Sequence, residues 1–569
     1  MSCTTQEGVS PDTTQGRVVV VGAGPVGMTL ALDLARRGTP VVVLDASPVT
    51  TANPRCNTTN ARSMEYFRRL GLAEEIRRAG LPADHATDVV YCTSMTGPEL
   101  TRFPFSSSRE VLDGTAHELA EWPSPEPQHR ISQIFLEPIL DRALQESTIA
   151  ELRRGHRVEA VHDGQDEVTV EVREVATGET YRISAAYVVG CDGGASLVRR
   201  SIGARLEGDS EASERRHSVY FRSPDLASHL GTRPGWMYWW FGPTYRGSVV
   251  VLDGRELFLC HARVPHGADP AAVDTEQVLA ESLGGQFDIE TLSVVPWTAR
   301  RLVADRFHSG RVLLAGDAAH LWLPLGGFGM NTGIADAMSL SWRLHAVLRG
   351  WAGTRVLDDY EVERRSVGEA TSRAALKIDG DMSGVGRDPA LREPGPRGDA
   401  LRAEVGARIQ QVDRQQWFSQ GVQFGARYVG SPGVVEAPSD EHGETSAIAA
   451  IDQYRPSVDA GARVPHHWRP DGSSLYDQLG DDFTLITRGA TAADVEPLRA
   501  AAAELGVPLS WLDLEETVDE LTYRDRRFVL VRPDHVVAWS SATPPTDPGV
   551  LLDSLLGRRT APESRLRTA

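Results

Sequence analysis

The sequence predicts an α/β protein with a Rossmann-type dinucleotide-binding domain, an inserted β-sheet domain and a smaller C-terminal α/β domain. The first observation is a strand at 17–21, a glycine turn, a helical stretch to about residue 37 and a second strand at 41–45. Such a βαβ unit implies a parallel sheet. The second observation is that strand-like stretches such as WMYWWFG, SVVVLDG and ELFLCHARV fill residues 205–300. The third is a further mixture of strand and helix patterns after residue 480.

These patterns divide the chain of 569 residues into several domains, as its length predicts. We expect a disordered tail over 1–16, a discontinuous cofactor-binding domain over 17–200 and 301–375, a substrate-binding sheet domain over 201–300 with part of 81–130, a helical or linker region over 376–460, and a C-terminal domain over 461–569.

Composition excludes several classes of function. The net charge of −19 and the absence of a long basic run argue against nucleic acid or a membrane surface as the main partner. The chain has no run of about 18 apolar residues, so we expect no membrane-spanning helix. The five cysteines form no C-x-x-C pair, so we expect neither a disulfide framework nor a metal site, and a cytoplasmic location.

The glycine pattern G-x-G-x-x-G occupies residues 22–27, between the first strand and the first helix. Gly22 makes the tight turn, Gly24 lets the backbone approach a pyrophosphate, and Gly27 lets helix and strand pack closely. The helix N-terminus then offers N–H groups to the phosphates. Asp45 ends the second strand, where an acid binds ribose hydroxyls. This unit predicts a dinucleotide site but does not distinguish NAD from FAD.

Two later motifs favour a flavin. The stretch YVVGCDGGASLVRRSIG places Asp192 and Arg199 after a strand, and RVLLAGD places Asp317 at the end of another strand of the same expected sheet. An acid there can bind the ribityl hydroxyls of FAD. The glycines at 326, 327 and 329 let backbone pass close to an isoalloxazine ring, and a helix from about residue 331 aims its positive end at that ring. The alternative is a loop that enters a core helix with Asp317 as its cap.

Taken together, these motifs resemble the FAD-dependent aromatic monooxygenases of the p-hydroxybenzoate-hydroxylase fold. The chain looks most similar to the phenol and 2,4-dichlorophenol hydroxylase branch, which includes antibiotic-tailoring hydroxylases. The carrying residues are GAGPVG at 22–27, PRCNTTNARSMEYFRRLG at 54–71, CDG at 191–193 and the run from GDAAH to MNTG at 316–333. The C-terminal domain is similar to the thioredoxin-like domain of that branch, here without redox cysteines.

The resemblance and the motifs together assign a set of cofactor residues. They are Gly22, Gly24, Pro25, Val26, Gly27, Asp45, Ala46, Arg55, Gln133, Asp192, Arg199, Gly316, Asp317, Pro324, Gly327, Gly329, Met330 and Asn331.

The activity that the resemblance implies is hydroxylation of a phenolic or hydroxy-heteroaromatic ring, in secondary-metabolite biosynthesis. FAD is reduced by transiently bound NADPH or NADH, reacts with O2, and transfers oxygen through a C4a-hydroperoxide. Three alternatives stay open: a tailoring oxygenase with decarboxylative or ring-oxidising chemistry, an NAD-dependent dehydrogenase, and a non-catalytic flavin-binding protein. Related enzymes imply a homo-oligomer, of two or more copies.

The substrate pocket is expected on the aromatic strand at 234–243. Alternate residues of a strand share one face, so Trp236, Tyr238 and Trp240 are assigned to the substrate, together with Pro324 and Gly326 of the glycine loop. Ordinary sheet core is the equally weighted alternative for the three aromatic residues.

No catalytic base is identified from the sequence. Some phenol hydroxylases carry a histidine two residues after the position of Arg55, where this chain has Asn57. The remaining catalytic candidates are therefore Asn57 itself, His117 and Arg246, for the last two of which solvated surface is the alternative. The family often has a Pro-Pro pair before the glycines, and here Leu323 precedes Pro324.

Overall fold

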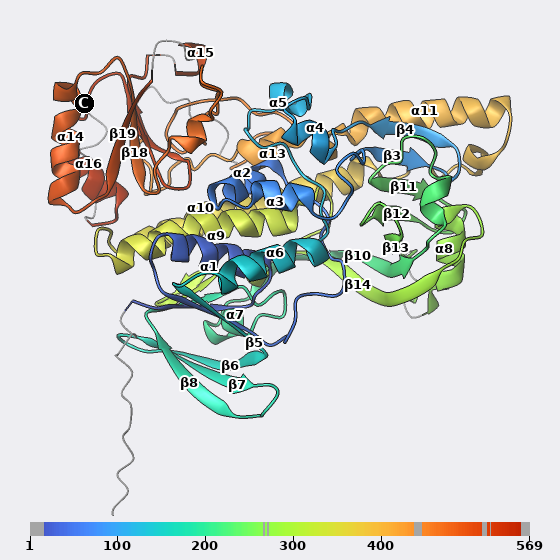
Figure 1. Cartoon of the computed structure of the whole chain (residues 1–569), viewed down its shortest axis with the longest axis horizontal. Coiled ribbons are helices and arrows are strands. Elements are labelled where there is room, and N and C mark those ends of the chain that lie inside the picture. The colour runs from blue at the N-terminus through green and yellow to red at the C-terminus, as the bar shows by residue number, and fades with distance from the viewer. Residues whose placement is uncertain are drawn as a thin grey trace, which may run out of the picture.

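The computed structural model describes residues 16–265, 268–269, 272–436, 447–514, 520–523 and 525–558. The expected tail over 1–16 therefore lies almost entirely outside the described residues. The described residues form four sheets, and Figure 1 shows the C-terminal domain at one end of the molecule and the eight-stranded sheet at the other. The expected mixed α/β fold is confirmed. Among the described helices, none is long and apolar enough to cross a membrane.

A six-stranded sheet forms the Rossmann-type core. Its strands, in spatial order, are β15 (His308–Ser309), β16 (Val312–Leu314), β9 (Tyr187–Gly190), β1 (Val18–Val21), β2 (Val41–Asp45) and β5 (Ala150–Arg154). All neighbours pair in parallel except β15 with β16. The valine-rich strands are buried because helices α1 (Pro25–Arg36), α6 (Gln133–Gln145) and α9 (Phe328–Leu348) cover this sheet.

An eight-stranded sheet forms the second body. Its strands, in spatial order, are β17 (His320–Leu321), β14 (Glu290–Ala304), β10 (Leu206–Arg222), β13 (Leu257–Arg263), β12 (Arg246–Val251), β11 (Met237–Phe241), β3 (Val89–Cys92) and β4 (Glu99–Phe103). The sheet thus continues past residue 300, because β17 belongs to the loop that follows the Rossmann strand β16. This continuity joins the two bodies at the cofactor loop.

Smaller elements fill the space around these sheets. A three-stranded antiparallel sheet consists of β6 (His156–Asp163), β7 (Val168–Glu174) and β8 (Thr180–Ala185). The short helices of the first 300 residues are α2 (Ala61–Arg69), α3 (Ala73–Arg78), α4 (Ser108–Leu112), α5 (Glu118–Glu121), α7 (Leu197–Ser201) and α8 (Thr275–Leu283).

The C-terminal third begins with helices and ends in a mixed sheet. The helices are α10 (Val356–Asp381), α11 (Pro396–Val412), α12 (Arg414–Trp417) and α13 (Gln420–Phe424). The sheet, in spatial order, holds β19 (Leu509–Leu514), β18 (Phe483–Arg488), β20 (Phe528–Val531) and β21 (Val537–Ser541). Helix α14 (Ala492–Glu504) connects the parallel pair β18 and β19, α15 (Glu520–Tyr523) precedes β20, and α16 (Pro548–Leu555) follows β21. This order is that of a thioredoxin-like core.

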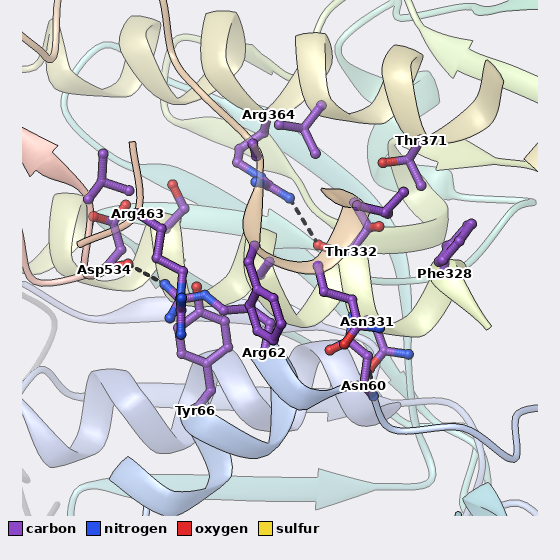
Figure 2. Close-up of a pocket in the computed structure, with 18 of the residues that line it drawn as sticks. Asn60, Arg62, Tyr66, Phe328, Asn331, Thr332, Arg364, Thr371, Arg463 and Asp534 are labelled. Atoms are coloured by element: carbon purple, nitrogen blue, oxygen red, sulfur yellow. Dashed lines mark hydrogen bonds between the residues drawn. The ribbon is translucent and has the colours of Figure 1, made fainter. Parts of the chain in front are cut away.

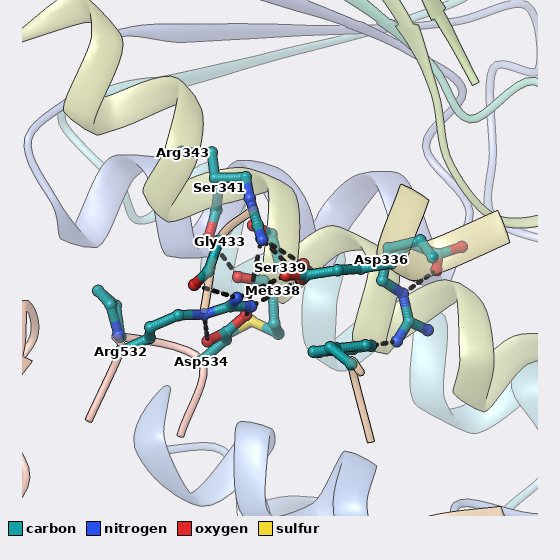
Figure 3. Close-up of polar contacts among 12 residues, drawn as sticks. Asp336, Met338, Ser339, Ser341, Arg343, Gly433, Arg532 and Asp534 are labelled. Carbon is teal, nitrogen blue, oxygen red and sulfur yellow. Dashed lines mark hydrogen bonds and ion pairs between the residues drawn. The ribbon is translucent and has the colours of Figure 1, made fainter. Parts of the chain in front are cut away.

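A buried ion network fixes the C-terminal domain to the rest of the chain (Figure 3). Arg532, in the turn between β20 and β21, donates to both carboxylate oxygens of Glu363 on α10, at 2.7 and 2.9 Å. Its Nη2 also donates to Asp534 at 2.6 Å, and Arg343 on α9 donates to Glu363 at 2.7 Å. All four side chains are buried. Buried ions that complete each other's hydrogen bonds specify how two bodies dock.

We therefore expect Arg532→Met to weaken domain docking. The substitution leaves buried carboxylates short of partners, which costs about 3–5 kcal/mol. Urea unfolding followed by tryptophan fluorescence should show that loss in the first transition. The control Arg153→Met removes a partly exposed arginine that pairs with Glu151 at 2.8 Å, and should cost below about 1 kcal/mol. Equal losses in the two variants would contradict the role of the network.

Candidate functional site

A cavity of about 650 Å³, the large cavity below, lies where the two large sheets meet. One wall is the carboxyl edge of the parallel sheet, where ligands bind in open α/β folds. The second is the loop before α9, and the third is a face of the eight-stranded sheet. Of the residues predicted to bind cofactor, those that line this cavity are Gly24, Pro25, Val26, Arg55, Gln133, Asp317, Pro324, Gly327, Gly329 and Met330.

The glycine turn has two packed glycines and one open glycine. A Cβ atom on Gly22, whose φ is 106°, would collide with the carbonyl of Cys191, and one on Gly27 would collide with the carbonyl of Gly22. A Cβ on Gly24 would meet no protein atom within 4 Å. The N-terminus of α1 begins there, and no side chain of the described residues caps it. Its first N–H groups therefore face the cavity without an intrahelical partner.

Asp45 supports this turn through hydrogen bonds to backbone N–H groups. Its Oδ2 accepts a hydrogen bond from the backbone N–H of Ala23 at 2.6 Å, and its Oδ1 accepts from Ser47 N–H at 2.8 Å. Neither Asp45 nor the half-buried Ala46 lines the cavity itself. In this geometry the carboxylate holds the glycine turn in shape.

In the second motif, Cys191 and Gly193 line the cavity, whereas the side chains of Asp192 and Arg199 do not and instead hold backbone in place. Asp192 accepts from the N–H groups of Leu197 and Val198, at 2.6 and 3.1 Å, and so caps α7. Arg199 donates to the carbonyls of Ala318 and Gly194, at 2.9 and 2.8 Å. The sequence predicts that these two side chains contact the cofactor. In the structure their polar atoms are bonded within the protein instead.

The third motif supplies the cofactor loop. The Asp317 carboxylate lines the cavity and is exposed to it. Loss of solvation raises the pKa of Asp317, and the charges of His320 and Arg55 oppose that rise. Gly327 has a φ of 63° and lies so close to Thr58 that a Cβ would approach the Thr58 Cβ to 2.7 Å. Because this left-handed residue forms the N-cap, α9 begins at Phe328, three residues earlier than predicted.

Three predicted residues of this motif position the loop from outside the cavity lining. The Asn331 amide donates to the carbonyls of Thr58 and Gly327, at 2.9 and 2.6 Å. Gly316 donates its N–H to Asp336 at 3.1 Å, and a Cβ on Gly326 would overlap the ring of Phe328. Gly326 therefore packs against its neighbour and does not line the predicted substrate pocket.

The sheet wall uses the opposite face of the aromatic strand from the one predicted. Met237 and Trp239 line the cavity, whereas Trp236 and Tyr238 are buried on the other side, in the core of the sheet domain. Trp240 contributes to a smaller cavity and is also buried. The alternation of strand β11 was therefore recognised but assigned to the wrong face. Ordinary sheet core, the alternative, describes Trp236 and Tyr238.

A polar patch on the sheet wall was missed from the sequence. The Trp297 indole donates to Ser218 Oγ at 2.6 Å, and Ser218 Oγ lies 2.6 Å from His261 Nδ1. All three line the cavity and come from three different strands. Their spacing along the chain gives no signal, because only the antiparallel pairing of β10 with β13 and β14 brings them together.

Only one of the three catalytic candidates reaches the cavity. Asn57 lines it, and its buried Oδ1 has no hydrogen-bond partner among the described residues. His117 lies at the start of α5, partly exposed and 3.2 Å from Ser106 Oγ, away from the cavity lining. Arg246 lines a neighbouring cavity of about 40 Å³ instead. The described residues also hold no cluster of side chains that could bind a metal ion.

The neighbouring cavity shares Arg216, Trp239 and Leu325 with the large one and contains a buried acid, Asp413. Tyr91 donates its hydroxyl to Asp413, and the Trp417 indole donates to the Tyr91 oxygen at 2.9 Å. Loss of solvation raises the pKa of Asp413 to about 7, against the opposing hydrogen bonds of Tyr91 and Trp417.

A third cavity, of about 70 Å³, separates the Rossmann body from the C-terminal domain (Figure 2). The labelled polar residues around it include Arg62 and Tyr66 on α2, Asn331 and Thr332 on α9, and Arg364 and Thr371 on α10. Phe328 lines both this cavity and the large one. Asn331 lines this cavity and donates to the carbonyl of Thr58, which lines the large one.

The residues of the large cavity fit FAD. The open Gly24 and the uncapped helix suit a pyrophosphate. The Asp317 carboxylate and the Arg55 guanidinium project into the cavity with no hydrogen-bond partner among the described residues. The N-terminus of α9 faces the same space and offers positive potential to an electron-rich ring.

Comparison with known proteins agrees with this geometry. Residues 15–375 match the family model of an FAD binding domain, and residues 458–558 match that of the C-terminal domain of aromatic-ring hydroxylases. The chain is 31% identical to the FAD-dependent monooxygenase apdD of Emericella nidulans, over 92% of this chain and 87% of that protein. It is 30% identical to 2,4-dichlorophenol 6-monooxygenase of Delftia acidovorans, over 92% and 94%.

A solved structure gives the same result. RebC, soaked with chromopyrrolic acid and with 7-carboxy-K252c bound, superposes with a TM-score of 0.87 at 34% identity, over 96% of this chain and 100% of that one. The chain therefore belongs to the FAD-dependent aromatic-ring hydroxylases. It is a flavoprotein monooxygenase that uses FAD, with NAD(P)H as electron donor and O2 as co-substrate. The expected family and cofactor are confirmed.

The open glycine gives a direct test of cofactor placement. Gly24→Val should leave the fold intact, because the added side chain meets no protein atom within 4 Å of its Cβ. It should lower FAD affinity at least about tenfold, because it fills the space of the pyrophosphate. Visible flavin absorbance per protein and far-UV circular dichroism measure the two effects. Gly380→Ala, at an open position on α10, is the control, and full flavin content in Gly24→Val would refute the placement.

The buried acid predicts a pH effect on stability. Because the folded state raises the pKa of Asp413 to about 7, it keeps a proton that the unfolded chain has already lost. Stability therefore falls as the pH rises from the ordinary carboxyl pKa towards 7. Asp413→Asn removes this titration, so its stability relative to the wild type should improve by about 2 kcal/mol between about pH 5 and pH 8. A pH-independent difference in urea unfolding would contradict the shifted pKa.

Proposed function

We propose that the enzyme hydroxylates a phenolic or hydroxy-heteroaromatic ring within a polycyclic molecule of secondary metabolism. The observation that carries the proposal is one cavity of about 650 Å³ that joins the cofactor edge of the Rossmann sheet to a broad sheet wall. That wall contributes residues from β10, β11, β12, β13 and β14, which is more surface than a single phenol contacts. RebC, a rebeccamycin biosynthetic enzyme that is 34% identical and holds 7-carboxy-K252c, supports a substrate of secondary metabolism.

The cofactor roles follow from the cavity lining. Gly24 and the first turn of α1 accept the pyrophosphate, Arg55 and Gln133 hold the phosphates or ribityl chain, and Asp317 holds the ribityl hydroxyls. Residues 327–330 border the flavin ring. FAD, when bound, supplies the redox chemistry that activates O2 for transfer to an electron-rich ring. The protein orients the two rings and excludes water from between them.

The substrate roles follow from the sheet wall. One face of the Trp239 indole is stacked on Tyr91 at a centroid distance of 6.2 Å, and the other is offered to the substrate. Met237 and Val250 complete an apolar surface. Ser218, His261 and Trp297 offer the polar contacts that orient a hydroxylated ring. Asn57 contacts the ring edge nearest the cofactor loop.

A second candidate reaction is oxidative or decarboxylative tailoring of a polycyclic acid. It is favoured by the likeness to RebC, whose structure holds 7-carboxy-K252c after a soak with chromopyrrolic acid. A homo-oligomeric state, a cytoplasmic location and NADPH or NADH as the transiently bound electron donor also belong to the proposal. The four described cysteines are free, as in a reducing compartment.

The test is NADPH and NADH oxidation by the FAD-loaded enzyme with phenols, hydroxypyridines and polycyclic phenols, with trapping of H2O2. Polycyclic phenols should stimulate oxidation most and release little peroxide. Trp239→Ala should raise KM about tenfold, because it removes a stacking surface worth about 1–2 kcal/mol. The exposed Trp468→Ala is the matched control. Absence of stimulation by every ring would refute the proposed substrate class.

A further inference from the structure

Arg130 is a buried cation with few partners. It is 2% exposed, and among the described residues its side chain makes one hydrogen bond, from Nη1 to Thr58 Oγ1 at 3.2 Å. Nε and Nη2 have no partner among the described residues, and no carboxylate there forms an ion pair with it. The rings of Trp236, Phe105 and Trp417 surround the guanidinium at centroid distances of 4.5, 5.3 and 5.8 Å.

Such a group is costly, and the neighbouring Arg77 shows the usual solution. Arg77 is equally buried, but it donates to Glu126 through Nε and Nη2, at 3.1 and 2.8 Å. A buried charge without a paired ion strongly lowers the stability of the folded state. Cation–π contacts with the surrounding aromatic rings offset only part of that loss of stability. The arrangement around Arg130 therefore suits a negative group that comes with a ligand.

The backbone places Arg130 directly behind the cavity wall. Thr59 and His129 exchange backbone hydrogen bonds of 2.9 and 2.7 Å, and Gln133 N–H donates to the carbonyl of Cys56 at 2.8 Å. The segment 129–133 thus runs beside the segment 56–60. Cys56, Asn57 and Thr58 line the cavity, so the Arg130 side chain is the layer beneath them.

Thr58 connects the cation to the cavity. Because its Oγ1 accepts a hydrogen bond from Arg130, its hydroxyl proton points elsewhere and has no acceptor among the described residues. Thr58 lines the cavity and also touches the cofactor loop, where Gly327 has no room for a Cβ. A hydroxyl that accepts from a guanidinium is a stronger donor to an anion than an isolated hydroxyl.

We propose that Thr58, polarised by Arg130, binds the phenolate oxygen of the substrate and that this pair favours the ionised phenol. The inference rests on the proposed phenolic substrate. It also accounts for Asn57 at the position where a base was sought: the phenol releases its proton to solvent as it binds, and no side chain has to accept that proton. Thr58 is the substrate-contacting residue, and Arg130 is a positioning residue that acts through it.

The surrounding charges are compatible with this role. Loss of solvation lowers the pKa of Arg130 to about 9, opposed by the nearby Glu118 and Cys56, so the guanidinium is charged at neutral pH. Glu118 on α5 is itself buried and accepts from Ser106 N–H at 2.8 Å. Burial raises the pKa of the Cys56 thiol, and the pKa of His129 is held well below its usual range, so both are neutral.

The experiment is a spectrophotometric pH titration of 4-nitrophenol bound to the FAD-loaded enzyme, because the phenolate absorbs differently from the phenol. In the wild type the bound probe should be at least tenfold more acidic than in solution. Arg130→Met and Thr58→Val should each remove most of that tenfold effect. Arg130→Lys and Thr58→Ser should restore part of it, which a purely structural role would not produce. Arg77→Met, which removes a buried charge near Arg130, should leave the acidity of the bound probe unchanged.

Several outcomes overturn the inference. It fails if the bound probe is no more acidic than in solution, if the probe does not bind, or if Arg130→Met and Thr58→Val leave its acidity unchanged. Thr58→Val keeps the test valid should Arg130→Met not fold, because valine has the same shape as threonine. If phenols still stimulate NADPH oxidation in the wild type, only the inference is overturned. If they do not, the proposed function fails with it.

Discussion

The arrangement of the catalytic region depends on one buried carboxylate, Asp336 on α9. It accepts from Gly316 N–H at 3.1 Å, from His320 Nε2 at 2.7 Å and from Arg364 Nε at 2.7 Å. Loss of solvation would raise its pKa, but the charge of Arg364 together with His320 holds that pKa below its usual value, so Asp336 stays ionised. One side chain thus joins the cofactor loop, the short strand β17 and the helix α10.

Asp336 also connects the cavity to the C-terminal domain, through its partner Arg364. Arg364 also donates to Tyr428 at 2.9 Å and to the carbonyl of Thr332 at 3.3 Å, while Glu363 beside it meets Arg532. Helices α9 and α10 therefore carry the cofactor loop on one side and the C-terminal domain on the other (Figure 1). The thioredoxin-like domain, which contains no cysteine, is joined to α9 and α10 through Arg343, Glu363 and Arg532.

The parts that sequence predicts well are those set by local chemistry. The glycine turn, the strand ends at Asp45 and Asp317, and the loop at 324–330 follow from residue type and spacing alone, and they meet at one sheet edge. The parts that were missed depend on packing between distant segments. Period-two alternation identifies two faces of β11 but not which one faces Trp297, and nothing local shows that Asp192 caps α7 or that Arg130 lies behind Thr58.

The central claim is that one cavity holds both the flavin ring and the aromatic substrate, between the cofactor loop and the sheet wall. The most direct measurement is a crystal structure of the enzyme with FAD and a polycyclic phenol. The account predicts the flavin ring against residues 327–330 and the phenol between that ring and Trp239, with its oxygen at Thr58. A phenol bound outside this cavity, or a flavin ring turned away from the sheet wall, would contradict the account.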